Sequence, residues 1–480
     1  MANRWSLRAW NRAACWSGAL AAVLLSVADP ATLPGACPLE TLPQRANGAA
    51  IPLGSVSISA SGRFLAFASY GRLVAADTNG RSDIYVYDLT NGRITFESLL
   101  PNGTPSNGDS YRPSISADGR FVVFETSGQL AGGGDAVVQV VLRDRQLAVT
   151  SVLSRSRIGA LGNQSSGHPV ISGDGGIVAF QSGATNLLPS AEPSLPTIDV
   201  YAMVPESGEI WPMSRVSGAS DGKAGSNFSP ALSSDGLHLA FTFKESADDA
   251  VAFGPARPGT VALRDVAQAP SEVRVYAIRR GTIASVSRRT DGRPANGRSY
   301  LPAISGDGRY VAFVSEATNL VASDTNGAAD VFLHDLQSGS TDLVSRSRRG
   351  RTGNGASSYP ALSLGARFIA FQSEAADLVC ASRCSALERD INLTSDVFVF
   401  DRESDTMTRI SEDTAGPWLE PSGTPAVDGT GAILAFSSRR PIDARDVSSD
   451  FDLFVRRCSP SRPAAHCFDG QLGTARVGAH

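Results

Sequence analysis

The sequence predicts an all-β fold, a seven-bladed β-propeller whose blades are four-stranded antiparallel sheets. A short apolar run ending in Phe occurs seven times, each time after a small-residue segment and a tight turn. The runs are 56 to 72 residues apart, and self-similarity at such a period indicates one supersecondary unit copied along the chain. The seven anchor phenylalanines are Phe67, Phe124, Phe180, Phe241, Phe313, Phe371 and Phe436.

The unit is clearest over residues 300–349. Apolar and small residues alternate at the start, a Gly-Asp-Gly turn follows, and the later segments are rich in β-branched and aromatic residues, as strands are. No segment is long enough for a helical crossover, so the four strands form a meander, the unit of a propeller blade. The predicted strands are 302–305, 310–314, 331–335 and 341–345.

The seventh blade has no clear fourth strand after the segment 451–455. Residues 40–48 mimic the strand and loop that precede the later blades, so we expect the N-terminal segment to close the ring as the outer strand of blade seven. Closure removes exposed sheet edges. The predicted organisation is a signal peptide over 1–28, the propeller over 38–457 and a C-terminal tail over 458–480.

The repeated pattern S-x-D-G-R-x-V-A-F, followed by D-x-N-G-x-x-D-V-F-x-x-D, resembles the WD40-like (PD40) repeats of TolB-type propellers of bacterial envelopes. The resemblance covers residues 40–457, roughly. It implies the propeller fold and leaves function open, because such propellers serve as scaffolds, as binding modules and as appendages of peptidases. The separate N-terminal α/β domain of TolB has no counterpart in this sequence.

The first 28 residues have the layout of a signal peptide, with Arg4, Arg8 and Arg12, an apolar run and a small-residue cleavage site. We therefore expect an exported protein that is periplasmic, at the cell surface or extracellular, without a transmembrane span. Loss of three arginines leaves 40 Lys and Arg against 47 Asp and Glu, a net charge of −7. This mildly acidic balance argues against a nucleic-acid partner.

Five cysteines remain after signal removal, and export makes disulfides possible. Cys380 and Cys384 lie close enough in sequence for a local bridge. Cys37 and Cys458 flank the proposed ring closure, but pairing of Cys458 with Cys467 competes with that bridge. Lipidation at Cys37 is a further alternative.

The long connections and the insertions 184–198, 243–271 and 375–395 all fall on one face of the propeller. Loops on a rigid scaffold commonly carry binding. One or two places before the Pro of the first strand, five blades carry an aromatic or His residue, either a ligand platform at the channel mouth or packing between blades. These residues are Tyr111, His168, Phe228, Tyr300 and Tyr359.

Three loops share the spacing D-x-N-x-x-x-D. Alternating oxygen side chains resemble the start of a Ca²⁺ loop, whereas the alternative is that Asp and Asn cap the turn. Apart from possible Ca²⁺ we expect no cofactor. The candidate ligands are Asp77, Asn79 and Asp83, then Asp324, Asn326 and Asp330, then Asp390, Asn392 and Asp396.

No catalytic constellation stands out. The G-x-S-x-G match at 218–222 lies in an interblade loop instead of a strand-to-helix turn, and the five histidines are scattered singly. We therefore predict a monomeric, non-catalytic interaction scaffold of the bacterial envelope, not an enzyme, which binds a protein partner through the long-loop face. The alternative is a carbohydrate-binding or carbohydrate-active propeller that uses the channel-mouth aromatics.

Overall fold

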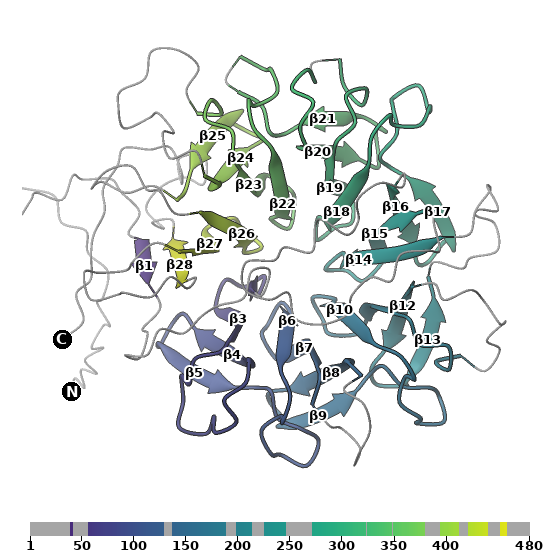
Figure 1. Ribbon diagram of the computed structural model, residues 1–480, viewed down its shortest axis with the longest axis vertical. Coiled ribbons are helices and arrows are strands. Elements are labelled where there is room, and N and C mark those ends of the chain that lie inside the picture. The colour runs from purple at the N-terminus through teal and green to yellow at the C-terminus, as the bar shows by residue number, and fades with distance from the viewer. Residues whose placement is uncertain are drawn as a thin grey trace, which may run out of the picture.

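The structure is a computed structural model that describes eleven segments of the chain. They are 39–41, 56–128, 137–188, 198–213, 225–245, 271–322, 324–347, 349–379, 394–411, 421–439 and 452–457. Within these segments the strands form seven four-stranded antiparallel sheets and no helix occurs. The sheets stand around a common centre (Figure 1), which confirms the predicted seven-bladed propeller.

Each blade is a meander whose first strand lies next to the centre. Blade one is β2 (Val56–Ile58), β3 (Phe64–Ser69), β4 (Asp83–Asp88) and β5 (Arg93–Phe96). Blade two is β6 (Ser110–Ile115), β7 (Phe121–Thr126), β8 (Gln139–Asp144) and β9 (Val149–Val152). Blade three is β10 (Ser166–Ile171), β11 (Val178–Ser182), β12 (Asp199–Val204) and β13 (Glu209–Pro212). Blade four is β14 (Ser226–Leu232), β15 (His238–Lys244), β16 (Ser271–Ala277) and β17 (Thr282–Ser285). Blade five is β18 (Ser299–Ile304), β19 (Tyr310–Ser315), β20 (Asp330–Asp335) and β21 (Thr341–Leu343).

Blade six is β22 (Ser357–Leu362), β23 (Phe368–Ser373), β24 (Asp396–Asp401) and β25 (Thr406–Arg409). Blade seven contains β26 (Ser422–Val427), β27 (Ile433–Ser438) and β28 (Asp452–Arg457), with β1 (Leu39–Thr41) as its outer strand. β1 pairs antiparallel with β28, with Glu40 opposite Val455. The N-terminal segment therefore closes the ring, as predicted.

The hydrophobic core lies between the blades. Seven clusters of buried apolar side chains each combine residues of two neighbouring blades, including the pair of blades seven and one. Every anchor Phe is at most 2% exposed, and five of them stack on an aromatic ring of the third strand with centroids 5.6 to 6.0 Å apart. One blade cannot bury both of its faces alone, so the ring stabilises every blade.

A ring of backbone hydrogen bonds joins the tight turns between the first and second strands. Each turn donates one N–H to a carbonyl of the next blade, at 2.8 to 3.1 Å, until the circle is complete. The bonds are Ser61 to Ala117, Ala117 to Gly173, Gly173 to Ser234, Asp235 to Gly306, Gly306 to Leu364, Leu364 to Gly429 and Gly429 to Ala60. This ring fixes the end of the central channel opposite the long loops.

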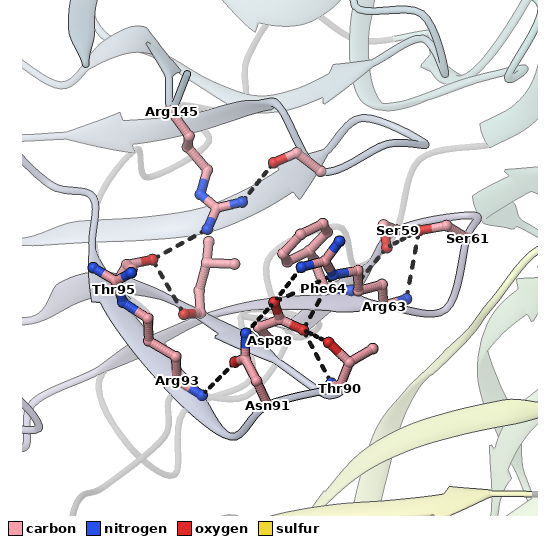
Figure 2. Close-up of polar contacts among 12 residues, drawn as sticks. Ser59, Ser61, Arg63, Phe64, Asp88, Thr90, Asn91, Arg93, Thr95 and Arg145 are labelled. Atoms are coloured by element: carbon pink, nitrogen blue, oxygen red, sulfur yellow. Dashed lines mark hydrogen bonds and ion pairs between the residues drawn. The ribbon is translucent and has the colours of Figure 1, made fainter. Parts of the chain in front are cut away.

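Arginines near this edge tie the blades together, as Figure 2 shows for blade one. Arg63 donates from Nη2 to Asp88 Oδ2 at 2.8 Å, and Asp88 also accepts from the Thr90 hydroxyl at 2.6 Å. Arg145 of blade two lies over the Phe64 ring, 4.9 Å from its centroid, and reaches Thr95 Oγ1 at 3.2 Å. The contacts of Arg63 lie within blade one, whereas those of Arg145 are cation–π and charge-assisted bonds between neighbouring blades.

Candidate functional site at the channel mouth

Six innermost strands carry the same β-bulge, at the residue that precedes the strand proline. The ladder register shifts there in blades two to seven. The bulge residue has a φ of +47° to +51°, although a non-Gly residue before Pro ordinarily prefers extended backbone. The six residues are Arg112, His168, Ser229, Leu301, Tyr359 and Thr424. Bulges re-aim side chains next to functional sites, and strained backbone collects there.

Polar side chains of the second strands hold several of these bulges in place. Glu125 Oε2 accepts the backbone N–H of His168 in the next blade at 2.9 Å, and Gln181 Oε1 accepts that of Ser229 at 2.9 Å. Glu125 is buried, and its other oxygen pairs with the Arg112 guanidinium. One carboxylate therefore positions two bulge residues from adjacent blades.

The charge of Arg112 acts on both His168 and Tyr359, although the three residues come from blades two, three and six. Burial and, to a smaller extent, the positive charge of Arg112 lower the pKa of His168 well below its usual value, so the imidazole is neutral at pH 7. Burial raises the pKa of Tyr359 to about 12, against the opposing effect of the same Arg112. Strands β6 and β22, which carry Arg112 and Tyr359, lie on opposite sides of the centre in Figure 1.

The five predicted channel-mouth residues do not form one platform. His168 and Tyr359 are half-buried bulge residues, whereas Tyr111, Phe228 and Tyr300 lie one position earlier. Tyr111 and Phe228 are buried, and the Tyr111 hydroxyl lies 2.6 Å from that of Tyr70 in blade one. The Tyr300 hydroxyl lies 3.4 Å from Glu316 Oε1. The bulge inserts an extra residue into the first strand, and this changes the direction of its side chain relative to that of the preceding residue. The two positions therefore differ in their surroundings.

Sequence reasoning missed Arg112 and Glu125. Arg112 could have been found by comparing the residue directly before the strand proline in all blades, since that position carries Arg in blade two. Glu125 has no such signal, because its role depends on contact with the bulge of the next blade.

The opposite end of the channel is lined mainly by apolar side chains. A cavity of about 190 Å³ there is lined by two residues from each blade. One of the two is branched, and the other is small in every blade except blade six, where it is Leu364. The branched residues are Ile58, Ile115, Ile171, Leu232, Ile304, Leu362 and Val427. Among the described residues the two ends of the channel thus differ in chemistry: the bulge end carries a charged group and an imidazole, and the cavity at the other end is lined by neither.

The acidic loops of blades one and five are built alike. Asn79 and Asn326 accept the N–H two residues ahead, at 2.8 and 2.9 Å, and therefore cap their turns. The amide of Asn79 donates to Asp83 at 3.1 Å, and that of Asn326 donates to Asp330 at 2.8 Å.

Burial raises the pKa of Asp83 and of Asp330 to about 7. Asp77 accepts a bond from the Tyr85 hydroxyl, at 2.5 Å, and Asp396 of blade six accepts one from Ser411 at 2.6 Å. Within the described part of the chain, no three His, Cys, Asp or Glu side chains gather as a metal cluster. Calcium binding by these loops stays a prediction.

Several predicted features lie outside the described residues. They are the signal peptide, the cysteines Cys37, Cys380, Cys384, Cys458 and Cys467, the loop residues Asp390 and Asn392, and most of the insertions 184–198, 243–271 and 375–395. In the described segments no helix is long and apolar enough to cross a membrane.

No known protein-family profile matches the sequence, and no curated protein matches it. Many solved structures share the fold. A prolyl endopeptidase structure has a TM-score of 0.50 at 10% identity, covering 86% of this chain and 50% of the endopeptidase. An oligogalacturonate lyase in complex with manganese has a TM-score of 0.49 at 11% identity, covering 86% and 91%. TolB from Acinetobacter baumannii has a TM-score of 0.39 at 12% identity, covering 74% and 65%.

The likeness to the prolyl endopeptidase shows the propeller fold, while membership of the TolB-type PD40 repeat family stays a prediction. This likeness also overturns two predictions, the non-catalytic scaffold and the statement that the chain is not an enzyme. The prolyl endopeptidase, which is an enzyme, contains the same propeller fold. Both predictions relied on the lack of a catalytic motif in the sequence. That inference was wrong because functional side chains of a propeller converge from separate blades, without a fixed spacing.

Proposed function

We propose that the chain binds a carboxylate-bearing ligand at the bulge end of the central channel and performs acid–base chemistry on it. The observation that carries the proposal is that Arg112, His168 and Tyr359 occupy the same strained bulge position in three blades, with the charge of Arg112 acting on both other side chains. Arginine recognises carboxylates through paired N–H donors. A neutral imidazole accepts a proton, and the hydroxyl of Tyr359 can donate one.

The proposed roles follow from these contacts. Glu125 orients Arg112 from behind and leaves the remaining guanidinium N–H groups for the ligand. Arg112 also offsets negative charge that develops on the ligand carboxylate when a neighbouring proton moves to His168. The signal-peptide layout of residues 1–28 supports a site of action outside the cytoplasm.

Calorimetric titration tests ligand binding. The probe is a short oligomer of uronic acids, and the matched control ligand is a neutral sugar oligomer of the same length. Replacing Arg112 alone would leave the Glu125 carboxylate buried without its partner, so the test variant is Arg112→Met with Glu125→Gln, compared with Glu125→Gln alone. We expect the double variant to bind the acidic oligomer about tenfold more weakly or worse, since a charge-assisted bond contributes roughly 1.5–3 kcal/mol.

A second control is Ser229→Ala, which changes a bulge residue of the same backbone geometry in blade four. It should leave affinity unchanged. Equal affinity of the native protein for acidic and neutral oligomers would contradict the carboxylate site. Mass spectrometry of the incubated oligomers tests turnover and separates hydrolysis from elimination by one water. Turnover that survives His168→Asn at the native rate would contradict the role of His168.

A further inference from the structure

Asp324, in the loop between β19 and β20, is a buried carboxylate without a visible counter-group. Only 6% of the residue is exposed, and neither carboxylate oxygen has a hydrogen-bond partner among the described residues. The nearby backbone N–H of Asn326 offsets part of the upward shift that burial causes in its pKa, without reaching hydrogen-bond geometry. Burying an unpaired charge is costly unless a proton or a cation neutralises it.

Blade one shows what is missing. Asp77 holds the same place in its loop, six residues before the start of the third strand, and the Tyr85 hydroxyl lies 2.5 Å from its Oδ2. The same hydroxyl lies 3.0 Å from the carbonyl oxygen of Gly71. In blade five Phe332 occupies the place of Tyr85, paired with the anchor Phe313 as Tyr85 is with Phe67. Both ring pairs stack with centroids 5.9 Å apart.

The contacts of the loop Asn and of the second Asp match in the two blades. Asn326 donates to Asp330 and to the Gly353 carbonyl, as Asn79 does to Asp83 and to that of Ser106. The Ser345 hydroxyl donates to Asp330 at 2.6 Å, as the Ser98 hydroxyl does to Asp83 at 2.5 Å. Both oxygens of Asp330 therefore already have donors. Around the first Asp the two loops thus differ at one hydroxyl, and its absence leaves Asp324 unpaired.

We propose that Asp324 binds a calcium-type divalent cation in the blade-five loop. A hard cation binds carboxylate, carbonyl and water oxygens. In blade five it would neutralise the charge of Asp324, as the Tyr85 hydroxyl stabilises that of Asp77 in blade one. Asp324 supplies the carboxylate, and backbone carbonyls of the loop and water complete the shell. A site with a single carboxylate is weak, so we expect a Kd of roughly 10⁻⁴ to 10⁻³ M, the range of extracellular calcium modules.

Two reciprocal variants of the full mature protein test the site. Phe332→Tyr supplies the hydroxyl in blade five, and Tyr85→Phe removes it from blade one. The melting temperature of each protein is measured in a calcium series and in chelator. Because the ion binds only the folded protein, calcium should raise the melting temperature of the native protein progressively. Phe332→Tyr and Asp324→Asn should both lose that rise, while Asp324→Asn should melt higher than the native protein in chelator.

Tyr85→Phe leaves Asp77 without its hydroxyl partner and should therefore gain a second calcium response. Calorimetric titration should show about one weak calcium site in the native protein and none in Phe332→Tyr. Identical melting of the native protein in calcium and in chelator would overturn the proposal. So would a calcium response that persists unchanged in Asp324→Asn, since the ion would then bind elsewhere.

Discussion

At the scale of single residues, the same backbone position serves different chemistry in different blades. The bulge residue is Arg in blade two, His in blade three and Tyr in blade six, but Leu301 in blade five is apolar. All of these blades have the strained positive φ directly before Pro. The propeller therefore presents one bulge side chain from each of them. Function depends on which residue types occupy that set, and only some blades carry groups that bind or transfer protons.

Buried carboxyl groups make stability depend on pH. Asp330 has its pKa raised to about 7 in the folded protein, above its ordinary value of 3.8, so the folded state holds a proton that the unfolded chain releases. Its contribution to stability is therefore present below about pH 4 and is lost as pH rises through about 7. We expect the melting temperature of the native protein, relative to Asp330→Asn, to fall between about pH 4 and pH 7 and to level off above that.

The comparison with Asp330→Asn separates the effect of Asp330 on stability from the effects of His168 and His334. Their pKa values are lowered by burial, so their effect on stability has the opposite sign. Asp88 and Asp335 have pKa values held down by Arg63 and Arg309 and act only in more acidic solution. A constant difference between native protein and variant across this range would mean that Asp330 is ionised at neutral pH in the folded state.

At the scale of elements, β1 is the strand on which ring closure depends. It contributes only three residues to the ladder with β28, yet it covers the outer edge of blade seven. An uncovered edge presents unpaired backbone N–H and carbonyl groups that can pair with another chain. Pairing of the first and last segments of a ring also ties the two ends of the described chain together.

Removing this strand should damage the whole molecule. A mature chain that lacks residues 29–50 loses β1. We expect it to melt at a lower temperature and to aggregate, as measured by calorimetry and light scattering. A matched control that lacks only residues 29–36 should behave like the full mature chain. An unaltered melting curve without residues 29–50 would show that β28 does not need this partner.

At the scale of the whole molecule, the architecture could be predicted because its signals are local and repeated. The seven anchor phenylalanines, the Gly-containing turns and the spacing of apolar runs each specify a blade without knowledge of the others. The site could not be predicted in the same way, because Arg112, His168 and Tyr359 belong to three different blades and share no sequence spacing. Glu125 is equally hidden, since it acts on the backbone of the neighbouring blade. The acidic loops were ambiguous for another reason: the partner of Asp77 is a tyrosine of the next strand.

The NMR titration of the His168 ring, without and with the uronic-acid oligomer, tests the central claim most directly. A carboxylate bound beside the imidazole favours its protonated form. The account predicts a pKa well below 6.5 in the free protein, caused by burial and Arg112, and a clear rise in that pKa when the acidic oligomer saturates the site. The neutral oligomer should leave it unchanged. An ordinary His168 pKa in the free protein, or the same pKa with and without the acidic oligomer, would contradict a carboxylate site at the channel mouth.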